Sequence, residues 1–242
     1  MKNKYFPHLA TIFFLGTILV TLFSWIGKVY GIGSIQSLLN SDGIRWELKS
    51  VISNYINQPA LGIVMILFIG LGVTIYSGFF DTLKRRVILR QGITRKERRS
   101  LYLSLLTLLI YISIVSWLTF SPFAILKSVT GTLANSPFEM GLFYLISFGI
   151  GLTGVVYGYI SGIYRNDRDI INGMTFLYRT CADYFLILFF IVQFFSSLIY
   201  SNMLQSIGVS EELIYTIFNL FCYLPLIQIF KVNSAQKYKK KY

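Results

Sequence analysis

The chain has 242 residues, of which 55% are hydrophobic and only 13% are charged, and its formal net charge is +12. A soluble domain usually contains about 25% charged residues, so this chain cannot cover its surface with charge in water. The composition excludes an ordinary soluble globular protein and a disordered chain, and it favours a membrane protein over a nucleic-acid-binding protein despite the positive charge.

Six apolar runs have about the length that a helix needs to cross the hydrocarbon core, which is about 20 residues. None of them carries a charged residue in its middle third. We therefore predict an all-α, polytopic membrane protein in which residues 1–242 form a single membrane domain. The first run is too long for a signal peptide, so we expect it to be retained. The predicted spans are 9–30, 61–80, 101–119, 140–163, 182–202 and 213–230.

The segment 31–60, between the first two predicted spans, has a helical pattern of its own. Its apolar residues recur on one face of a helix, which predicts a short amphipathic helix. We expect this helix to lie along the periplasmic membrane interface, where Trp46 suits the depth. An interfacial brace is the simpler interpretation, and docking of a partner is the alternative. The apolar face consists of Ile44, Leu48, Val51, Ile52 and Tyr55.

The basic residues are distributed unevenly between the two sides of the predicted spans. Eighteen of the 22 lysines and arginines lie in the N-terminus, the loop 81–100, the segment 164–180 and the tail 231–242. The positive-inside rule then predicts six spans with both termini in the cytoplasm, in a multi-pass protein of the bacterial inner membrane. We expect the basic loop and tail to meet membrane lipids rather than nucleic acid, because topology and anionic headgroups already account for these charges.

Three glycines in the fourth predicted span, Gly154, Gly158 and Gly162, are spaced four residues apart. They leave one helix face without side chains, so that another helix backbone can approach closely. The spacing therefore predicts helix packing. The partner helix belongs either to the same chain or to a second protein, as a homodimer or a hetero-complex with another membrane protein.

Few polar residues lie within the last two predicted spans, and each must find a partner away from lipid. A candidate polar path consists of Gln193, Asn202, Asn219 and Pro225. We expect Pro225 to kink or break the last span and to free carbonyl groups. No ionisable residue lies at mid-depth, which argues against a proton relay or an ion-coupled pump.

Nothing in the sequence predicts an enzyme. The chain has one histidine and two cysteines, and no Cys/His cluster has the spacing of a metal site. No catalytic or nucleotide-binding motif stands out. We expect no catalytic residues, no cofactor and no metal, and no disulfide between Cys181 and Cys222, which are predicted to lie at different membrane depths.

Several short motifs together resemble the AbgT family, the bacterial p-aminobenzoyl-glutamate transporters. Residues 37–46, Ser-Leu-Leu-Asn-Ser-Asp-Gly-Ile-Arg-Trp, resemble the family segment N-LL-S-x-E-G-L-x-W. Over the blocks 33–86 and 94–206, the order and spacing of the motifs follow those of the family. The further motifs are Ser136-Pro137-Phe138, Val156-Tyr157-Gly158, residues 166–171, residues 189–194 and Tyr200-Ser201-Asn202-Met203.

The departures from the family pattern are as informative as the resemblance. Family members carry a re-entrant hairpin unit before the Ser-Pro-Phe segment and another after the Tyr-Ser-Asn segment. This chain has only residues 81–100 and 204–212 at those places. It also has Ile199 where the family usually has Asn, and Asp183 where it has Gly. The resemblance thus implies the outer scaffold of such a transporter without its transport-domain hairpins.

Two functions follow from that resemblance. The first is a scaffold-like membrane subunit, corresponding to the outer or dimerisation part of an AbgT-type transporter, that acts through protein partners. The alternative is a minimal or split transporter for organic anions such as p-aminobenzoyl-glutamate.

Overall fold

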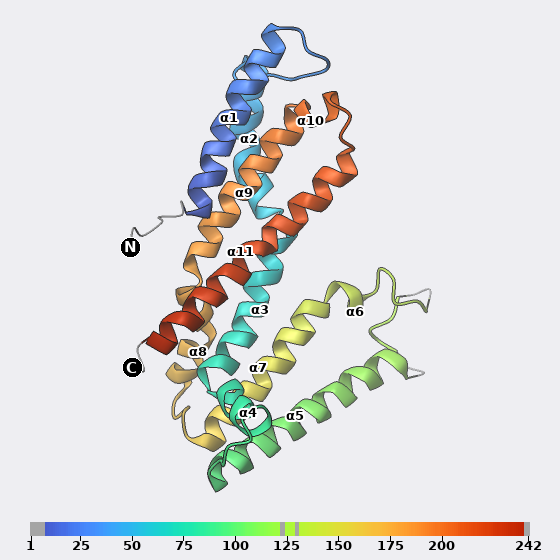
Figure 1. Cartoon of the computed structure of the whole chain (residues 1–242). Coiled ribbons are helices and arrows are strands. Elements are labelled where there is room, and N and C mark those ends of the chain that lie inside the picture. The colour runs from blue at the N-terminus through green and yellow to red at the C-terminus, as the bar shows by residue number, and fades with distance from the viewer. Residues whose placement is uncertain (1–7, 122–123, 129–130, 240–242) are drawn as a thin grey trace. The chain divides into compact units, whose positions relative to one another are not determined.

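The computed structural model describes residues 8–121, 124–128 and 131–239, and for residues 228–239 it describes the backbone alone. Every regular element in these ranges is a helix. The helices are α1 (Leu9–Val29), α2 (Ser41–Ile56), α3 (Pro59–Tyr76), α4 (Phe79–Val87), α5 (Arg95–Phe120), α6 (Pro137–Met140), α7 (Leu142–Ser161), α8 (Asp167–Thr180), α9 (Ala182–Tyr200), α10 (Met203–Ser206) and α11 (Glu211–Lys239), as labelled in Figure 1.

The predicted fold class, an all-α polytopic membrane protein, is confirmed. Within the described residues, five helical stretches are long and apolar enough to cross a membrane. The predicted span 213–230 lies within α11, where the side chains after Ile227 are outside the description. The count of six spans therefore stays a prediction. The five stretches are Leu9–Val29, Ser41–Tyr76, Arg95–Phe120, Leu142–Ser161 and Ala182–Tyr200.

The packing of the chain divides it into two compact units, and the single membrane domain stays a prediction. The first unit comprises Met1–Gly62 and Cys181–Tyr242, and the second comprises Ile63–Thr180. Each unit has a helical core of its own, so the two are described separately.

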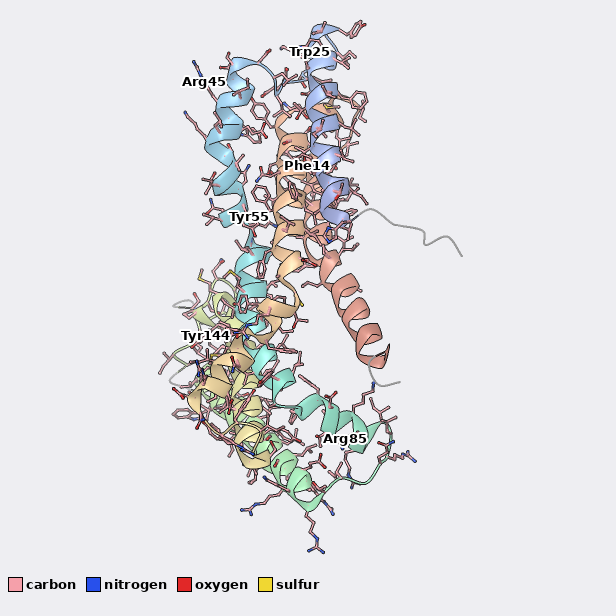
Figure 2. The ribbon with its side chains drawn as sticks, turned by 90° about the vertical axis from the view of Figure 1, so that its left-hand side faces the viewer. Phe14, Trp25, Arg45, Tyr55, Arg85 and Tyr144 are labelled. Carbon is pink, nitrogen blue, oxygen red and sulfur yellow. The ribbon has the colours of Figure 1, made fainter. Side chains whose placement is uncertain are left out.

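In the first unit, α9 packs against α1, α2 and α11. Phenylalanine rings pack between α1 and α9. The ring of Phe13 meets that of Phe194 edge-on at 5.5 Å between centroids, and Phe14 meets Phe190 in the same way. The labelled Phe14 lies beside α9 in Figure 2. Such edge-to-face pairs suit a lipid environment, because they gain packing energy without any polar group that needs a partner.

The amphipathic helix predicted in segment 31–60 is present as α2, and it runs antiparallel alongside α9. Trp46 stacks on Tyr200 at one end, with ring centroids 4.2 Å apart. At the other end, the Tyr55 hydroxyl donates to the Phe185 carbonyl at 3.1 Å. These contacts extend over 15 residues of α9, or about 22 Å of helix length. This arrangement differs from that of a helix lying alone in the plane of the membrane surface.

Both ends of α3 are set by a proline or a glycine. Asn57 and Gln58 separate the two helices, and α3 begins at Pro59. A residue before proline is pushed away from the α conformation, and proline is favoured in a first helical turn because its missing N–H would be unpaired there. At the other end α3 stops at Tyr76, earlier than the predicted span 61–80, because Gly78 adopts a left-handed φ of 77°.

In the second unit, α7 packs closely on α3 and extensively on α5. The Ser147 hydroxyl accepts from the Gly70 N–H at 3.1 Å and donates to the Ile66 carbonyl at 2.6 Å. One serine of α7 thereby bridges successive turns of α3. The Thr74 hydroxyl, in the other direction, lies 2.7 Å from the Ile150 carbonyl. Hydroxyl groups thus join the backbones of these two helices directly.

Candidate functional site

Of the residues in the predicted polar path, Gln193 is buried and has a hydrogen-bond partner in the structure. Its side chain is only 9% exposed, and its Nε2 donates to the Val51 carbonyl of α2 at 3.0 Å. A buried amide without a partner is costly in a membrane, so this bond links α2 to α9 at mid-length. Gln193 also lines a cavity of about 410 Å³ between α1, α2 and α9, together with Glu47 and several apolar side chains.

The other three residues of the predicted path do not line that cavity. Asn202 adopts a left-handed φ of 52° in the turn between α9 and α10. Asn219 is exposed on α11, whereas Pro225 is buried inside the same helix. α11 continues through Pro225. Proline removes one backbone donor from the helix, and the Tyr184 hydroxyl donates to the carbonyl of nearby Cys222 at 3.1 Å.

A second cavity of the first unit brings together amide and hydroxyl groups from α2, α9 and α11. Its volume is about 330 Å³. We call it the amide groove, and it was not among the sites predicted from the sequence. Asn54 in the last turn of α2 and Asn57, which directly follows the helix, are three residues apart, and this spacing was a signal for the groove, but the partner residues come from distant parts of the chain. The groove is lined by Trp46, Ser53, Asn54, Asn57, Gln58, Ser196, Ile199, Tyr200, Tyr215 and Phe218.

The second unit has a cavity of a different kind, between α5 and α7. Its volume is about 340 Å³, and apolar side chains make up nearly all of its wall. At this wall the Tyr111 hydroxyl donates to the Leu145 carbonyl at 2.9 Å. An apolar cleft of this size in a membrane protein suits an acyl chain or another apolar group, and it offers a polar ligand few partners.

The three predicted packing glycines have different surroundings. At Gly154, an added Cβ would lie 2.6 Å from the Thr74 Cα of α3. At Gly158, it would collide with the ring of Tyr164, whose hydroxyl donates to the Val73 carbonyl. Gly162 ends α7 with a left-handed φ of 79°. Gly154 therefore contacts the backbone of α3, and Gly158 contacts the side chain of Tyr164, which follows α7 in the chain. Gly162 ends α7 in a turn.

The basic loop 81–100 contains an ordered ion pair. Arg85 on α4 donates to the Glu97 carboxylate on α5 at 2.5 Å. The other oxygen of Glu97 accepts from the Thr94 N–H at 2.9 Å, which completes a capping box at the start of α5. A partly exposed ion pair contributes little stability by itself, but the cap fixes where α5 begins.

A second carboxylate cap begins α8. The Asp169 carboxylate accepts from the backbone N–H groups of Arg165 and Asn166, at 2.9 and 3.3 Å. These hydrogen bonds hold the pKa of Asp169 below its usual value, because they favour the charged form. The cap lies outside the membrane-spanning stretches.

Neither a metal site nor a reactive thiol pair is found in the described residues. They contain no group of three or more His, Cys, Asp or Glu side chains that could hold a metal ion. Cys181 and Cys222 are both buried and unpaired. The Cys222 sulfur accepts a hydrogen bond from Gln58 Nε2 at 3.3 Å, so it acts as a packing residue beside the amide groove.

Comparison with known proteins identifies the family to which this chain belongs. The family model for the AbgT putative transporter family matches residues 2–92 and 85–235. The chain belongs to the AbgT family. The resemblance that its motifs suggested is thereby confirmed, and the chain is a multi-pass membrane protein of a transporter family. No curated protein sequence matches it.

Two solved structures of other transporters share the AbgT-type fold. One is MtrF of Neisseria gonorrhoeae, described as illuminating a class of antimetabolite efflux pumps, with a TM-score of 0.75 and 17% identity over 85% of this chain and 72% of MtrF. The other is the YdaH transporter of Alcanivorax borkumensis, with a TM-score of 0.71 and 17% identity over 84% of this chain and 75% of YdaH. At this identity, the likeness establishes the fold.

Proposed function

We propose that this AbgT-family chain is a scaffold-like membrane subunit that acts through contacts with a protein partner. The observation that carries this proposal is the way in which the family model matches. It matches as two segments that meet at residues 85–92, inside the basic loop. At this point the chain passes from α4 to α5 in a short connection, at the place where the motif resemblance implies a hairpin unit in AbgT-type transporters.

The distribution of charge supports the same proposal. Moving a charge to the bilayer centre costs about 2.5–3.5 kcal/mol even by the lower estimates. An anionic substrate therefore needs compensating donors at that depth. In α9, the buried polar side chain nearest the middle is Gln193, and its amide nitrogen is already bonded to α2. This chain alone thus offers a dianion little compensation.

The proposal includes the orientation of the chain. The chain crosses the bacterial inner membrane six times, and both of its termini lie in the cytoplasm. The loop 81–100 lies on the cytoplasmic side and faces anionic lipid headgroups. The exposed cations of this loop and the asymmetry of basic residues support this topology. The partner is a second copy of the chain or another membrane protein.

A second candidate is a minimal or split transporter for organic anions such as p-aminobenzoyl-glutamate. Family membership and the fold shared with an efflux pump favour it. A split transporter needs a partner chain to supply the missing hairpins, whereas a minimal transporter works alone. The two candidates therefore differ in what the purified chain does without a partner.

Co-purification tests the proposal. The chain is extracted from its native membrane with a C-terminal tag, crosslinked, and analysed by mass spectrometry and native mass measurement. We expect a stable complex containing a second membrane subunit or a second copy. A chain that is purely monomeric under crosslinking in the native membrane would contradict the scaffold proposal.

A further inference from the structure

The amide groove of the first unit contains polar groups that the fold itself does not use. Tyr200 and Tyr215 contribute phenolic hydroxyls, and Ser196 contributes a third hydroxyl. Asn54 and Asn57 contribute two amides, of which the first is half-buried. None of these five side chains makes a hydrogen bond to another described residue. All five side chains are half-buried or exposed, so their polar groups are free to bond water or a ligand that enters the groove.

The walls of the groove are held in fixed positions. Trp46 and Tyr200 stack with ring planes 20° apart. Further along the two helices, Gln193 of α9 donates to the Val51 carbonyl of α2, and Tyr55 of α2 donates to the Phe185 carbonyl of α9. Gln58 is 8% exposed and is tied to α11 through Cys222. The groove is therefore a preformed site, which reduces the ordering cost of binding a ligand.

The lining defines the chemical class of ligand. None of the described residues that line it is Lys, Arg, Asp, Glu or His, so a charged ligand would be desolvated without a counter-charge from them. A purely apolar ligand would leave the amides and hydroxyls unpaired. Amides and hydroxyls both donate and accept, and the rings of Trp46, Tyr200 and Phe218 offer flat apolar surfaces. An uncharged ligand with several hydroxyl groups and one apolar face matches both features.

Size and position narrow the class further. A volume of about 330 Å³ lies near the lower end of the usual range for small-molecule sites, which begins at about 300 Å³. Ser196 lies four residues before the end of α9, or about 6 Å along the helix. The Trp and Tyr residues around it are the types enriched at membrane–water interfaces. The groove is thus accessible at interfacial depth, from water or from the lipid headgroup layer.

We propose that the amide groove binds an uncharged, polyhydroxylated group of monosaccharide size. The group is either a free sugar or the sugar headgroup of a glycolipid, since both present the same chemistry. The site belongs to the first unit alone. It therefore does not depend on the scaffold function, and a failure of either proposal leaves the other standing.

Intrinsic fluorescence of Trp46 tests the site directly. The sequence has three tryptophans, and the other two, Trp25 and Trp117, are exposed. Their replacement by Phe leaves Trp46 as the single reporter. The full chain is placed in nanodiscs of phosphatidylethanolamine and phosphatidylglycerol, because maltoside detergents would present a competing sugar. D-glucose, glucose 6-phosphate and, in separate discs, glucosyl diacylglycerol serve as probes.

We expect a saturable change of Trp46 emission with D-glucose or with the glucosyl lipid, and at least tenfold weaker binding of glucose 6-phosphate. A response to free glucose assigns a soluble ligand, whereas a response to the lipid alone assigns a glycolipid headgroup. Asn54→Leu and, separately, Asn57→Leu weaken the binding at least tenfold, with the helical circular dichroism unchanged. The matched control Asn172→Leu on α8 leaves it unchanged.

Three results would overturn the proposal. The first is no saturable response to either uncharged probe, which would mean that the groove holds water only. The second is equal or tighter binding of the phosphorylated sugar. The third is unchanged affinity in both asparagine variants. Because Asn57 is exposed, its replacement leaves the fold intact and keeps the test decisive even if the Asn54 variant fails to fold.

Discussion

In the first unit, α1 and α9 meet through phenylalanine rings, whereas in the second unit α3 and α7 meet through glycine backbones and hydroxyl groups. Ring contacts tolerate small shifts, since many arrangements of edge and face give similar energies. Backbone contacts at Gly154 and Gly70 tolerate almost none, because a glycine has no side chain that could move. The contact between α3 and α7 in the second unit is thus more rigidly specified than the contact between α1 and α9 in the first.

The largest effect is expected where a long side chain replaces a glycine of α7. In Gly158→Leu, the new side chain displaces the Tyr164 ring and breaks the bond from its hydroxyl to the Val73 carbonyl. Overpacking costs about 1–3 kcal/mol and occasionally more, and the lost hydrogen bond adds about 1 kcal/mol. We expect a strongly lowered unfolding temperature or loss of folded protein, measured in detergent. An unchanged unfolding temperature and oligomeric state would refute the packing role.

A smaller loss is expected from a single methyl group at the contact between α3 and α7. Gly154→Ala places Cβ against the Thr74 backbone, which cannot rotate away. We expect a destabilisation of about 1–3 kcal/mol. The matched control is Gly62→Ala, where no atom lies within 4 Å of the added Cβ and alanine favours the helix by about 1 kcal/mol. Equal unfolding temperatures for the two variants would show that the close approach does not contribute to stability.

A substitution at the contact between α1 and α9 in the first unit is expected to cost less stability. Phe13→Leu removes ring contacts with Phe194 and Phe221 but keeps an apolar side chain of similar bulk. A swap of this kind usually costs less than about 1.5 kcal/mol. Thermal unfolding should therefore shift less than in Gly154→Ala. A larger shift would contradict the distinction drawn between the two units.

The smallest effect concerns the cap of α8, and it depends on pH. The pKa of Asp169 is lowered in the folded chain by its two backbone hydrogen bonds. Its contribution to stability is therefore fully present above the usual carboxyl pKa, near about 4, and is lost as the pH falls through the lowered folded value. Asp169→Asn should reduce this acid dependence and leave the remaining pH profile unchanged. An acid limb identical to that of the unchanged chain would exclude this role.

Much of the fold follows from patterns within single segments. α1 and α9 begin at Leu9 and Ala182, the first residues of the predicted spans. The start of α5 lies earlier than the apolar run 101–119, because Thr94 and Glu97 form a capping box that hydropathy does not register. The end of α3 at Tyr76 depends on the left-handed conformation of Gly78, which interrupts an apolar run without changing its composition.

The candidate sites could be predicted only in part, because they depend on contacts between distant segments. An isolated glutamine such as Gln193 signals a need for a partner, but not that the partner is the Val51 carbonyl, 142 residues away. The periodicity of α2 predicts its helix and its apolar face, but not its position alongside α9. The amide groove combines three helices, so no local pattern contains it.

The most direct test of the central claim is transport by the chain alone. Labelled p-aminobenzoyl-glutamate is offered to liposomes containing only this protein, under imposed sodium and proton gradients, with protein-free liposomes as the control. A scaffold-like subunit without compensating charges at mid-depth gives no gradient-dependent accumulation. Gradient-dependent accumulation that is abolished by Gln193→Leu would contradict the scaffold account and establish the chain as a minimal transporter.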